Sequence, residues 1–191
     1  ELMNSEKKSI FLKTHSAMCN INGNMFTDSK NTLVFIYVVR DPRNVILSMA
    51  NHFKITQEEA FKIITDERHI IYPQINNQKI PATLVGSWSN NYNSWKNNNS
   101  IKNIIIRYED MINNPDETFE KIIIFLEKNA KIKYDKKKIM NVIAATKFDE
   151  LRKYEDKYGF NMGQKDKFFY LGKKNNWKDL LDKKIENEVK N

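Results

Sequence analysis

Residues 33–40 read LVFIYVVR, a nearly continuous run of β-branched and aromatic side chains. A strand with apolar side chains on both faces is typical of a parallel sheet that is covered by helices on its two sides. Asp41, directly after this run, is placed to cap a helix, and Pro42 would occupy the first helical position. The sequence therefore predicts a buried strand that leads straight into a helix, which is the repeating step of α/β folds.

Two further segments are predicted to be strands of the same sheet, residues 9–15 (SIFLKTH) and residues 101–108 (IKNIIIRY). After the later strand, Asn114 is placed as a helix cap, Pro115 follows it, and Glu117 would complete a capping box. A second strand followed by a helix is therefore expected in this part of the chain.

Further helices are expected from Thr56, where Glu59 would complete another capping box, and over residues 82–96, 135–145 and 147–158. Strands that alternate with helices are connected by right-handed crossovers, which place helices on both faces of the sheet. We therefore expect a doubly wound α/β fold, a three-layer sandwich with a parallel sheet.

Length and composition bound the class of protein. With 191 residues, 40% of them hydrophobic, and only 5 Gly and 4 Pro, the chain is long enough for one packed domain and poor in linkers. It contains no run of about 20 apolar residues, the length that a membrane helix needs. Its one cysteine, Cys19, can form no disulfide within the chain. These features favour a cytoplasmic protein with no membrane partner.

The formal net charge of +8 comes entirely from residues 128–191, which hold 18 Lys and Arg against 10 Asp and Glu. A basic field attracts nucleic acids, acidic surfaces and anionic small ligands alike, and it most often marks only a solvated lysine-rich face. Because the chain has no helix-turn-helix or zinc-finger spacing, no nucleic-acid partner is expected. No cluster of His, Asp and Glu has metal-ligand spacing either, so no metal is expected.

Basic side chains stand at the predicted carboxyl ends of all three strands. Lys13 and His15 end the first, Arg40 ends the second, and Arg107 precedes Tyr108 at the end of the third. Ligands of open parallel sheets bind outside this edge, where helix N-termini also point their free N–H groups. Since neighbouring like charges repel unless an anion joins them, this pattern predicts an anion-binding site.

Arg40 and Ser48 are eight residues apart, with Ser48 about two turns into the predicted helix. The two side chains can grip one phosphate only if the turn between strand and helix folds Arg40 back along the helix.

Five blocks of the sequence resemble the successive signature blocks of the cytosolic-type sulfotransferases. They are FLKTHSA, YVVRDPRNVILSMANHF, IIIRYEDMINNPDETFEKIIIFL, FDELRKYEDKYGF and FFYLGKKNNWKD, in the family's order over residues 11–177. The resemblance implies the P-loop-kinase-like topology of this α/β fold. It also implies 3'-phosphoadenosine 5'-phosphosulfate (PAPS) as the donor co-substrate, and a small-molecule or glycan acceptor with a hydroxyl or amine group. A nucleotide kinase is the nearest rival by fold, and the Lys-Thr-His block favours sulfate.

Two residues of that first block match the family's catalytic residues. His15 matches the general base that takes the acceptor proton, a role that suits an imidazole at neutral pH. Lys13 matches the residue that stabilises charge on the transferring sulfuryl group.

The resemblance also implies a set of donor contacts. Arg40 and Ser48 match the pair that binds the 3'-phosphate, and Tyr108 matches a contact on the adenine side, although an ordinary packed tyrosine is nearly as good an interpretation. Thr146 and Phe148 match the segment that shapes the pocket for the nucleotide base.

The late phosphate loop departs from the family pattern. Gly172 matches the glycine at which the backbone approaches the 3'-phosphate, but Tyr170 and Leu171 stand where the family usually has arginine and lysine. Lys173, or Lys174 after it, is a candidate replacement, although an ammonium cannot reproduce the bidentate contact of a guanidinium.

The family opens with a strand, a phosphate-binding loop and its helix, all before the Lys-Thr-His block. Only ten residues precede Phe11 here, and the chain contains no G-x-x-x-x-G-K-[ST] motif. We therefore expect residues 1–191 to form a single sulfotransferase-like domain that is N-terminally truncated. Its incomplete sheet would favour a homo-oligomer or an upstream segment as a partner. Two functions stay open: a PAPS-dependent sulfotransferase, and a catalytically inactive nucleotide-binding or interaction module derived from that fold.

Overall fold

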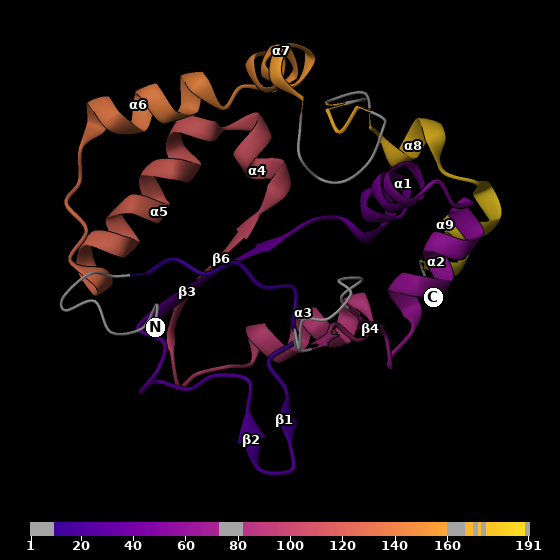
Figure 1. Cartoon of the computed structure of the whole chain (residues 1–191), viewed down its shortest axis with the longest axis horizontal. Coiled ribbons are helices and arrows are strands. Elements are labelled where there is room, and N and C mark those ends of the chain that lie inside the picture. Colours follow the sequence, from indigo (N-terminus) through magenta and orange to yellow (C-terminus); the bar gives the residue numbers. More distant parts are fainter. Residues whose placement is uncertain (1–9, 73–81, 160–166, 170–171, 173–174, 190–191) are drawn as a thin grey trace.

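The computed structural model describes residues 10–72, 82–159, 167–169, 172 and 175–189, and two parallel strands lie at its centre (Figure 1). β3 (Val34–Val39) pairs with β6 (Lys102–Arg107) along its whole length, so that Val39 ends the first strand opposite Arg107 at the end of the second. Parallel strands require a crossover connection between them. This pair therefore confirms the predicted α/β class with a parallel sheet.

One face of the strand pair is covered by α5 (Pro115–Ala130). Val34 and Ile36, two residues apart on β3, pack with buried Ile122 of α5 in one hydrophobic cluster. Alternate residues of a strand point to the same face, which is why these two share a partner. The apolar stripe of α5 thus holds the helix on the sheet, with α6 (Lys136–Ala145) outside it (Figure 1).

The opposite face of β3 packs against α3 (Trp88–Lys96). Phe35 lies in an edge-to-face arrangement with buried Trp95, with 4.8 Å between ring centroids, and Tyr37 packs against the same cluster. With α5 above the strands and α3 below them in Figure 1, the described residues form the three layers that the sequence predicts.

A third hydrophobic cluster lies beside the sheet, where four helices meet (Figure 1). These helices are α1 (Pro42–Phe53), α2 (Gln57–Thr65), α8 (Trp177–Leu180) and α9 (Lys183–Val189). The buried members of the cluster are Ile46, Leu47, Ala60, Ile64, Leu181 and Ile185. This packing fastens residues 175–189 onto α1, the helix that follows β3.

Two helix starts are formed as the sequence predicts. The Asp41 carboxylate accepts a hydrogen bond from the backbone N–H of Arg43 at the start of α1, where Pro42 is the first helical residue. Thr56 and Glu59 form a complete capping box at the start of α2. Both caps satisfy N–H groups that a helix cannot pair internally.

The predicted start of α5 at Asn114 and Pro115 is confirmed, but the predicted capping hydrogen bonds of Asn114 and Glu117 are not formed. Asn114 precedes the helix but its side chain makes no capping hydrogen bond, and the Glu117 carboxylate pairs with Lys121 at 2.8 Å instead. The physical reason is the short helix α4 (Tyr108–Asn113), which follows β6 directly and ends just before Asn114. Asn114 ends α4 by donating its backbone N–H to the carbonyl of Asp110, and this leaves it outside the extended conformation that a capping residue adopts.

The helix predicted over residues 82–96 begins later, at Trp88. Residues 83–84 form β5 (Thr83–Leu84) instead, which pairs with β4 (Ile70–Ile71), and Gly86 has a φ of 68°. Such a φ interrupts a right-handed helix. Ser87 then caps α3. The remaining elements are the hairpin of β1 (Asn20–Ile21) and β2 (Asn24–Met25), and α7 (Phe148–Tyr158).

The predicted first strand is wrong for the residues of it that the structure describes. Residues 10–15 form no strand, and Ile10, Phe11 and Leu12 are 51%, 69% and 81% exposed. An extended segment becomes part of a sheet only when a neighbour exchanges backbone hydrogen bonds with it, and among the described strands β3 pairs with β6 alone. The end of this segment is held by the His15 carbonyl, which accepts from Asn91 Nδ2 at 3.2 Å, and by the N–H of Ala17, which donates to the carbonyl of Leu84 at 2.7 Å.

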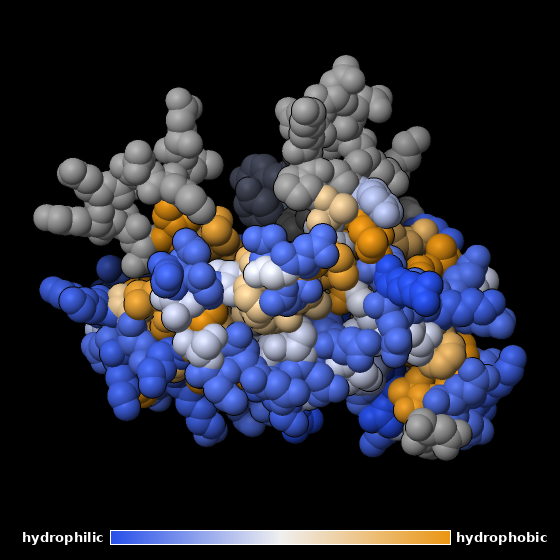
Figure 2. Space-filling view, turned by 90° about the horizontal axis from the view of Figure 1, so that it is seen from below, coloured by the Kyte–Doolittle hydropathy of each residue, from blue (hydrophilic) through white to orange (hydrophobic). Residues whose placement is uncertain are grey.

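The face of the molecule in Figure 2 is mostly hydrophilic, with separate hydrophobic patches among the polar side chains. Within the described ranges, none of the helices has the length and apolar character needed to cross a membrane.

Candidate anion-binding site

The carboxyl ends of β3 and β6 bring Arg40 and Tyr108 together. Each follows its strand directly, and the pairing of Val39 with Arg107 sets them next to each other. The Arg40 guanidinium carbon lies 4.4 Å from the centroid of the Tyr108 ring. This cation–π contact fixes the plane of the guanidinium over the ring.

Arg40 also turns back along α1 to reach Ser48. Arg40 Nη1 donates a hydrogen bond of 2.8 Å to Ser48 Oγ, which lies two turns into the helix. The backbone is held in this turn by Trp88, whose Nε1 donates to the Arg40 carbonyl at 3.2 Å. Arg40, Ser48 and Tyr108 therefore form one cluster at the carboxyl edge of the sheet.

Asn175 belongs to the same cluster, and sequence reasoning missed it. Its Nδ2 donates to Ser48 Oγ at 2.8 Å, and its backbone N–H donates to the carbonyl of Gly172 at 3.1 Å. In the sequence of that loop, Lys173 and Lys174 are the candidates to replace the absent arginine. A neutral amide three residues after Gly172 gives no comparable signal of anion binding. Its position in the same loop as Gly172 is the signal that could have found it.

Two polar atoms of the cluster are buried and have no hydrogen-bond partner among the described residues, namely Arg40 Nε and Asn175 Oδ1. Buried polar groups are nearly always paired, so an orphaned guanidinium N–H is unusual. An anion bound here would supply the acceptor that Arg40 lacks.

Arg43, the second basic residue after β3, does not point into the cluster. Its Nε and Nη2 donate to both oxygens of Asp41, at 2.9 and 2.6 Å, and its guanidinium carbon lies 3.7 Å from the ring of Trp177. Desolvation by burial would raise the pKa of Asp41, but the hydrogen bonds and charge of Arg43 outweigh it and hold that pKa below its usual value. Arg43 thus clamps α8 to the start of α1.

Gly172 packs against Phe148. Its φ is 54°, and a Cβ at this position would lie 2.9 Å from two carbons of the Phe148 ring. The Phe148 ring in turn meets Phe169 edge-to-face, with 5.9 Å between centroids. The predicted residues Phe148 and Gly172 are therefore neighbours, because only a glycine allows the backbone this close to the ring.

Glu155 holds the segment before Gly172. The buried carboxylate accepts hydrogen bonds from the backbone N–H groups of Phe168 and Phe169, at 2.5 and 3.0 Å. Hydrogen bonds to a charged acceptor are stronger than neutral ones, so this contact ties the segment to α7. Sequence reasoning did not single out Glu155, because a glutamate in a charged helix gives no signal of burial.

Thr146 ends α6, two residues before Phe148. It is exposed, and its hydroxyl donates to the carbonyl of Val142 at 2.7 Å. Lys173 lies outside the described residues. The structure therefore does not bring Thr146 into the Arg40 cluster, and it does not test the prediction for Lys173.

Lys13 and His15 lie on the exposed extended segment before β1. Asn91 Nδ2 donates to the His15 carbonyl at 3.2 Å, but within the described ranges no hydrogen bond or ion pair joins either side chain to Arg40 or Ser48. Partial desolvation, with repulsion from Lys13, lowers the pKa of His15 below its usual 6.5. The imidazole is therefore neutral at pH 7 and able to accept a proton.

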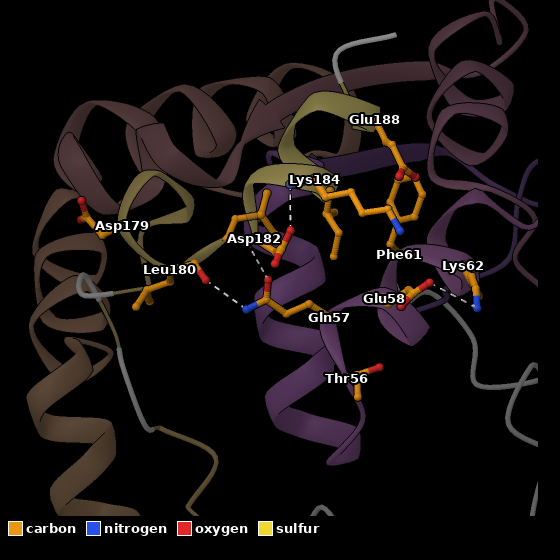
Figure 3. Close-up of a pocket in the computed structure, with 12 residues that line it drawn as sticks. Thr56, Gln57, Glu58, Phe61, Lys62, Asp179, Leu180, Asp182, Lys184 and Glu188 are labelled. Carbon is orange, nitrogen blue, oxygen red and sulfur yellow. Dashed lines mark hydrogen bonds and ion pairs between the residues drawn. The ribbon is translucent and has the colours of Figure 1, made fainter.

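A hollow lies away from this cluster, between α2 and α9 (Figure 3). It measures about 560 Å³, and none of the sequence-predicted site residues lines it. Gln57 spans it, donating to the carbonyl of Leu180 at 3.0 Å and accepting from the N–H of Asp182 at 2.9 Å, as Figure 3 shows. The Gln57 amide thus links α2 to the end of α8 and to the residue before α9, so the hollow lies at the junction of these helices.

Helices on both faces of a parallel sheet place this chain in the class of α/β proteins whose ligands bind outside the carboxyl ends of the strands, the edge at which Arg40 and Ser48 lie. The chain matches the family model described as "Sulfotransferase domain" over residues 1–191, and it belongs to this family. No curated protein matches the chain.

Two solved structures share the fold. One is the crystal structure of mouse sulfotransferase SULT7A1 complexed with PAP, with a TM-score of 0.60 and 17% identity, covering 85% of this chain and 57% of that one. The other is retinol dehydratase in complex with androsterone and the inactive cofactor PAP, with a TM-score of 0.54 and 16% identity, covering 81% and 44%. The chain therefore spans only about half the length of these two proteins, and at such identities the likeness concerns the fold.

Proposed function

We propose that this protein is a PAPS-dependent sulfotransferase that transfers a sulfuryl group to an acceptor hydroxyl or amine. The observation that carries the proposal is the Arg40–Ser48 pair. Arg40 donates a hydrogen bond of 2.8 Å to Ser48, and its guanidinium lies over the Tyr108 ring. Arg40 Nε is left buried without a partner among the described residues. A guanidinium N–H with a hydroxyl beside it is a donor set that suits a phosphate.

The co-substrate would supply the reactive sulfuryl group. In the transfer, the bond between sulfur and the 5'-phosphate oxygen breaks, a bond from the acceptor oxygen or nitrogen to sulfur forms, and 3'-phosphoadenosine 5'-phosphate (PAP) leaves. His15 would take the acceptor proton, for which its lowered pKa keeps the imidazole neutral. Lys13 would stabilise charge on the transferring group.

The proposal gives the other predicted site residues the following roles. Arg40 and Ser48 would bind the 3'-phosphate, and Tyr108, which supports Arg40, would lie on the adenine side. Gly172 and Phe148 are in contact, so the glycine would set how closely the late loop approaches the ligand. Thr146 and Lys173 remain predicted contacts of the base pocket and of the phosphate.

Calorimetric titration tests the donor site directly. The full chain should bind PAP more tightly than adenosine 5'-phosphate, which lacks the 3'-phosphate. Arg40→Lys should weaken PAP binding by about tenfold or more, because an ammonium cannot both donate to Ser48 and stack over Tyr108. Arg152→Lys, an exposed change on α7, is the matched control and should leave the affinity unchanged.

Equal affinities for the two nucleotides, or no binding of PAP at high micromolar concentration, would contradict the proposal. Transfer is then measured with labelled PAPS and a panel of alcohols, phenols and amines. Specific binding of PAP without transfer to any acceptor would favour the inactive nucleotide-binding module instead.

A further inference from the structure

Asn175 makes a contact that a packing residue does not need. It lies at the edge of the cluster, where its amide meets Ser48 Oγ, the same atom that accepts from Arg40. A hydroxyl oxygen has two acceptor lone pairs and one hydrogen to donate. With Arg40 Nη1 and Asn175 Nδ2 both donating to it, Ser48 has its acceptor capacity filled, and its hydrogen is free to donate.

The alternative orientation of the amide also leaves hydrogens of the cluster without an acceptor. Exchanging Nδ2 and Oδ1 of Asn175, which are nearly equal in size, lets the Ser48 hydroxyl donate to Oδ1. The buried acceptor is then satisfied, and the Asn175 N–H hydrogens become free. In both orientations Arg40 Nε still has no acceptor among the described residues. The cluster therefore always has at least two hydrogens in excess, one of them on a cation.

An excess of buried donors beside a positive charge is completed by an anion with several acceptor oxygens. The late loop is the part of the chain in which the family's two cations are replaced by Tyr170 and Leu171. Asn175 reaches the cluster from this same loop.

Resting on the proposed function, we propose that Asn175 is a ligand-binding residue of the 3'-phosphate subsite. Its amide acts with Ser48 as a donor unit, either directly or by directing the Ser48 hydrogen to the phosphate. In this chain a neutral amide would then provide part of the hydrogen bonding to the phosphate that the family's arginine and lysine usually provide. The consequence is a subsite that recognises phosphate with fewer positive charges, so its affinity depends less steeply on salt.

The test compares PAP with adenosine 5'-phosphate by calorimetry in the full chain. Asn175→Ala should weaken PAP binding by about tenfold or more, the usual effect of losing a hydrogen bond to a charged group, and should leave adenosine 5'-phosphate unchanged. Asn175→Asp should weaken PAP binding further, because a carboxylate beside a phosphate repels it. Asn176→Ala is the matched control. This neighbouring asparagine points away, donating to Asp179 at 2.8 Å, so the change should not affect either nucleotide.

A thermal melt without ligand separates binding from packing. If Asn175 serves the ligand, Asn175→Ala should change the melting temperature of the free protein by no more than about 2 °C, since an unpaired buried oxygen disappears together with one hydrogen bond. A large loss of stability without ligand, or equal weakening of both nucleotides, would overturn the role of Asn175. If the unchanged protein itself fails to prefer PAP, the proposed donor site is what fails.

Discussion

Replacing Gly172 with alanine should destabilise the late loop through two separate effects. At a φ of 54° a Cβ costs about 1–2 kcal/mol, because it approaches the carbonyl of its own residue. The new methyl group would also lie 2.9 Å from two carbons of the Phe148 ring. Overpacking of this kind costs about 1–3 kcal/mol. The two effects together lower the free energy of unfolding by roughly 2–5 kcal/mol.

For a chain of this length, 1 kcal/mol corresponds to about 2–4 °C in Tm, so a loss of roughly 2–5 kcal/mol in Gly172→Ala should lower the Tm by about 4–20 °C. PAP affinity should fall as well, because the loop that carries Asn175 is displaced. Differential scanning calorimetry and PAP titration measure the two effects.

Gly23→Ala provides the matched control for Gly172→Ala. Gly23 has a φ of 85°, and no atom lies within 4 Å of the position that a methyl group would take, so alanine there suffers the backbone cost alone. Adding Phe148→Leu to Gly172→Ala should recover part of the lost stability, since the smaller side chain relieves the contact. The reasoning is refuted if both glycine variants lose the same Tm and PAP affinity is unchanged, or if Phe148→Leu recovers nothing.

Two further predictions concern His15 and Glu155. Desolvation and Lys13 lower the pKa of His15, so turnover should rise with pH with a midpoint below pH 6.5, and His15→Ala should abolish this dependence. Because the unfolded chain binds a proton at His15 more readily than the folded protein does, the free energy of unfolding should fall as the pH falls below 6.5. An NMR titration midpoint of His15 above 6.5 would contradict both the turnover and the stability prediction. Glu155→Gln should cost about 1.5–3 kcal/mol, because the amide can accept only one of the two N–H groups and sets its own NH₂ against the other. Hydrogen exchange should then accelerate at residues 168–169, while Glu150→Gln, an exposed change on the same helix, should have no effect there.

The central part of the fold follows from local patterns in the sequence. The apolar runs around β3 and β6 and the caps at Asp41 and Thr56 are strong local signals, and the structure agrees with each. The segment at residues 10–15 has an equally apolar pattern but forms no strand, because pairing depends on a neighbour rather than on the segment itself. Asn114 fails for a related reason, since its backbone is already committed to ending α4.

For the site, sequence spacing suggests the Arg40–Ser48 pair but cannot show the further member of the cluster. Asn175 is far from Ser48 along the chain, and its approach depends on the packing of α8 and α9 against α1. Burial of Glu155 is likewise a tertiary property. The roles of all the predicted site residues remain predictions.

The contact between Arg43 and Trp177 can form only after the ribosome has synthesised all the residues between them. At roughly 5–20 residues per second, synthesis takes on the order of ten seconds to advance from α2 to Trp177. During that interval Ile46 and Ile64 have no Leu181 or Ile185 to cover them, and they present an apolar strip to which a chaperone can bind. Arg40 and Ser48 can meet early, but Asn175 joins them only when this late segment has emerged, so the cluster around Ser48 is completed only after residues 175–189 can pack against α1.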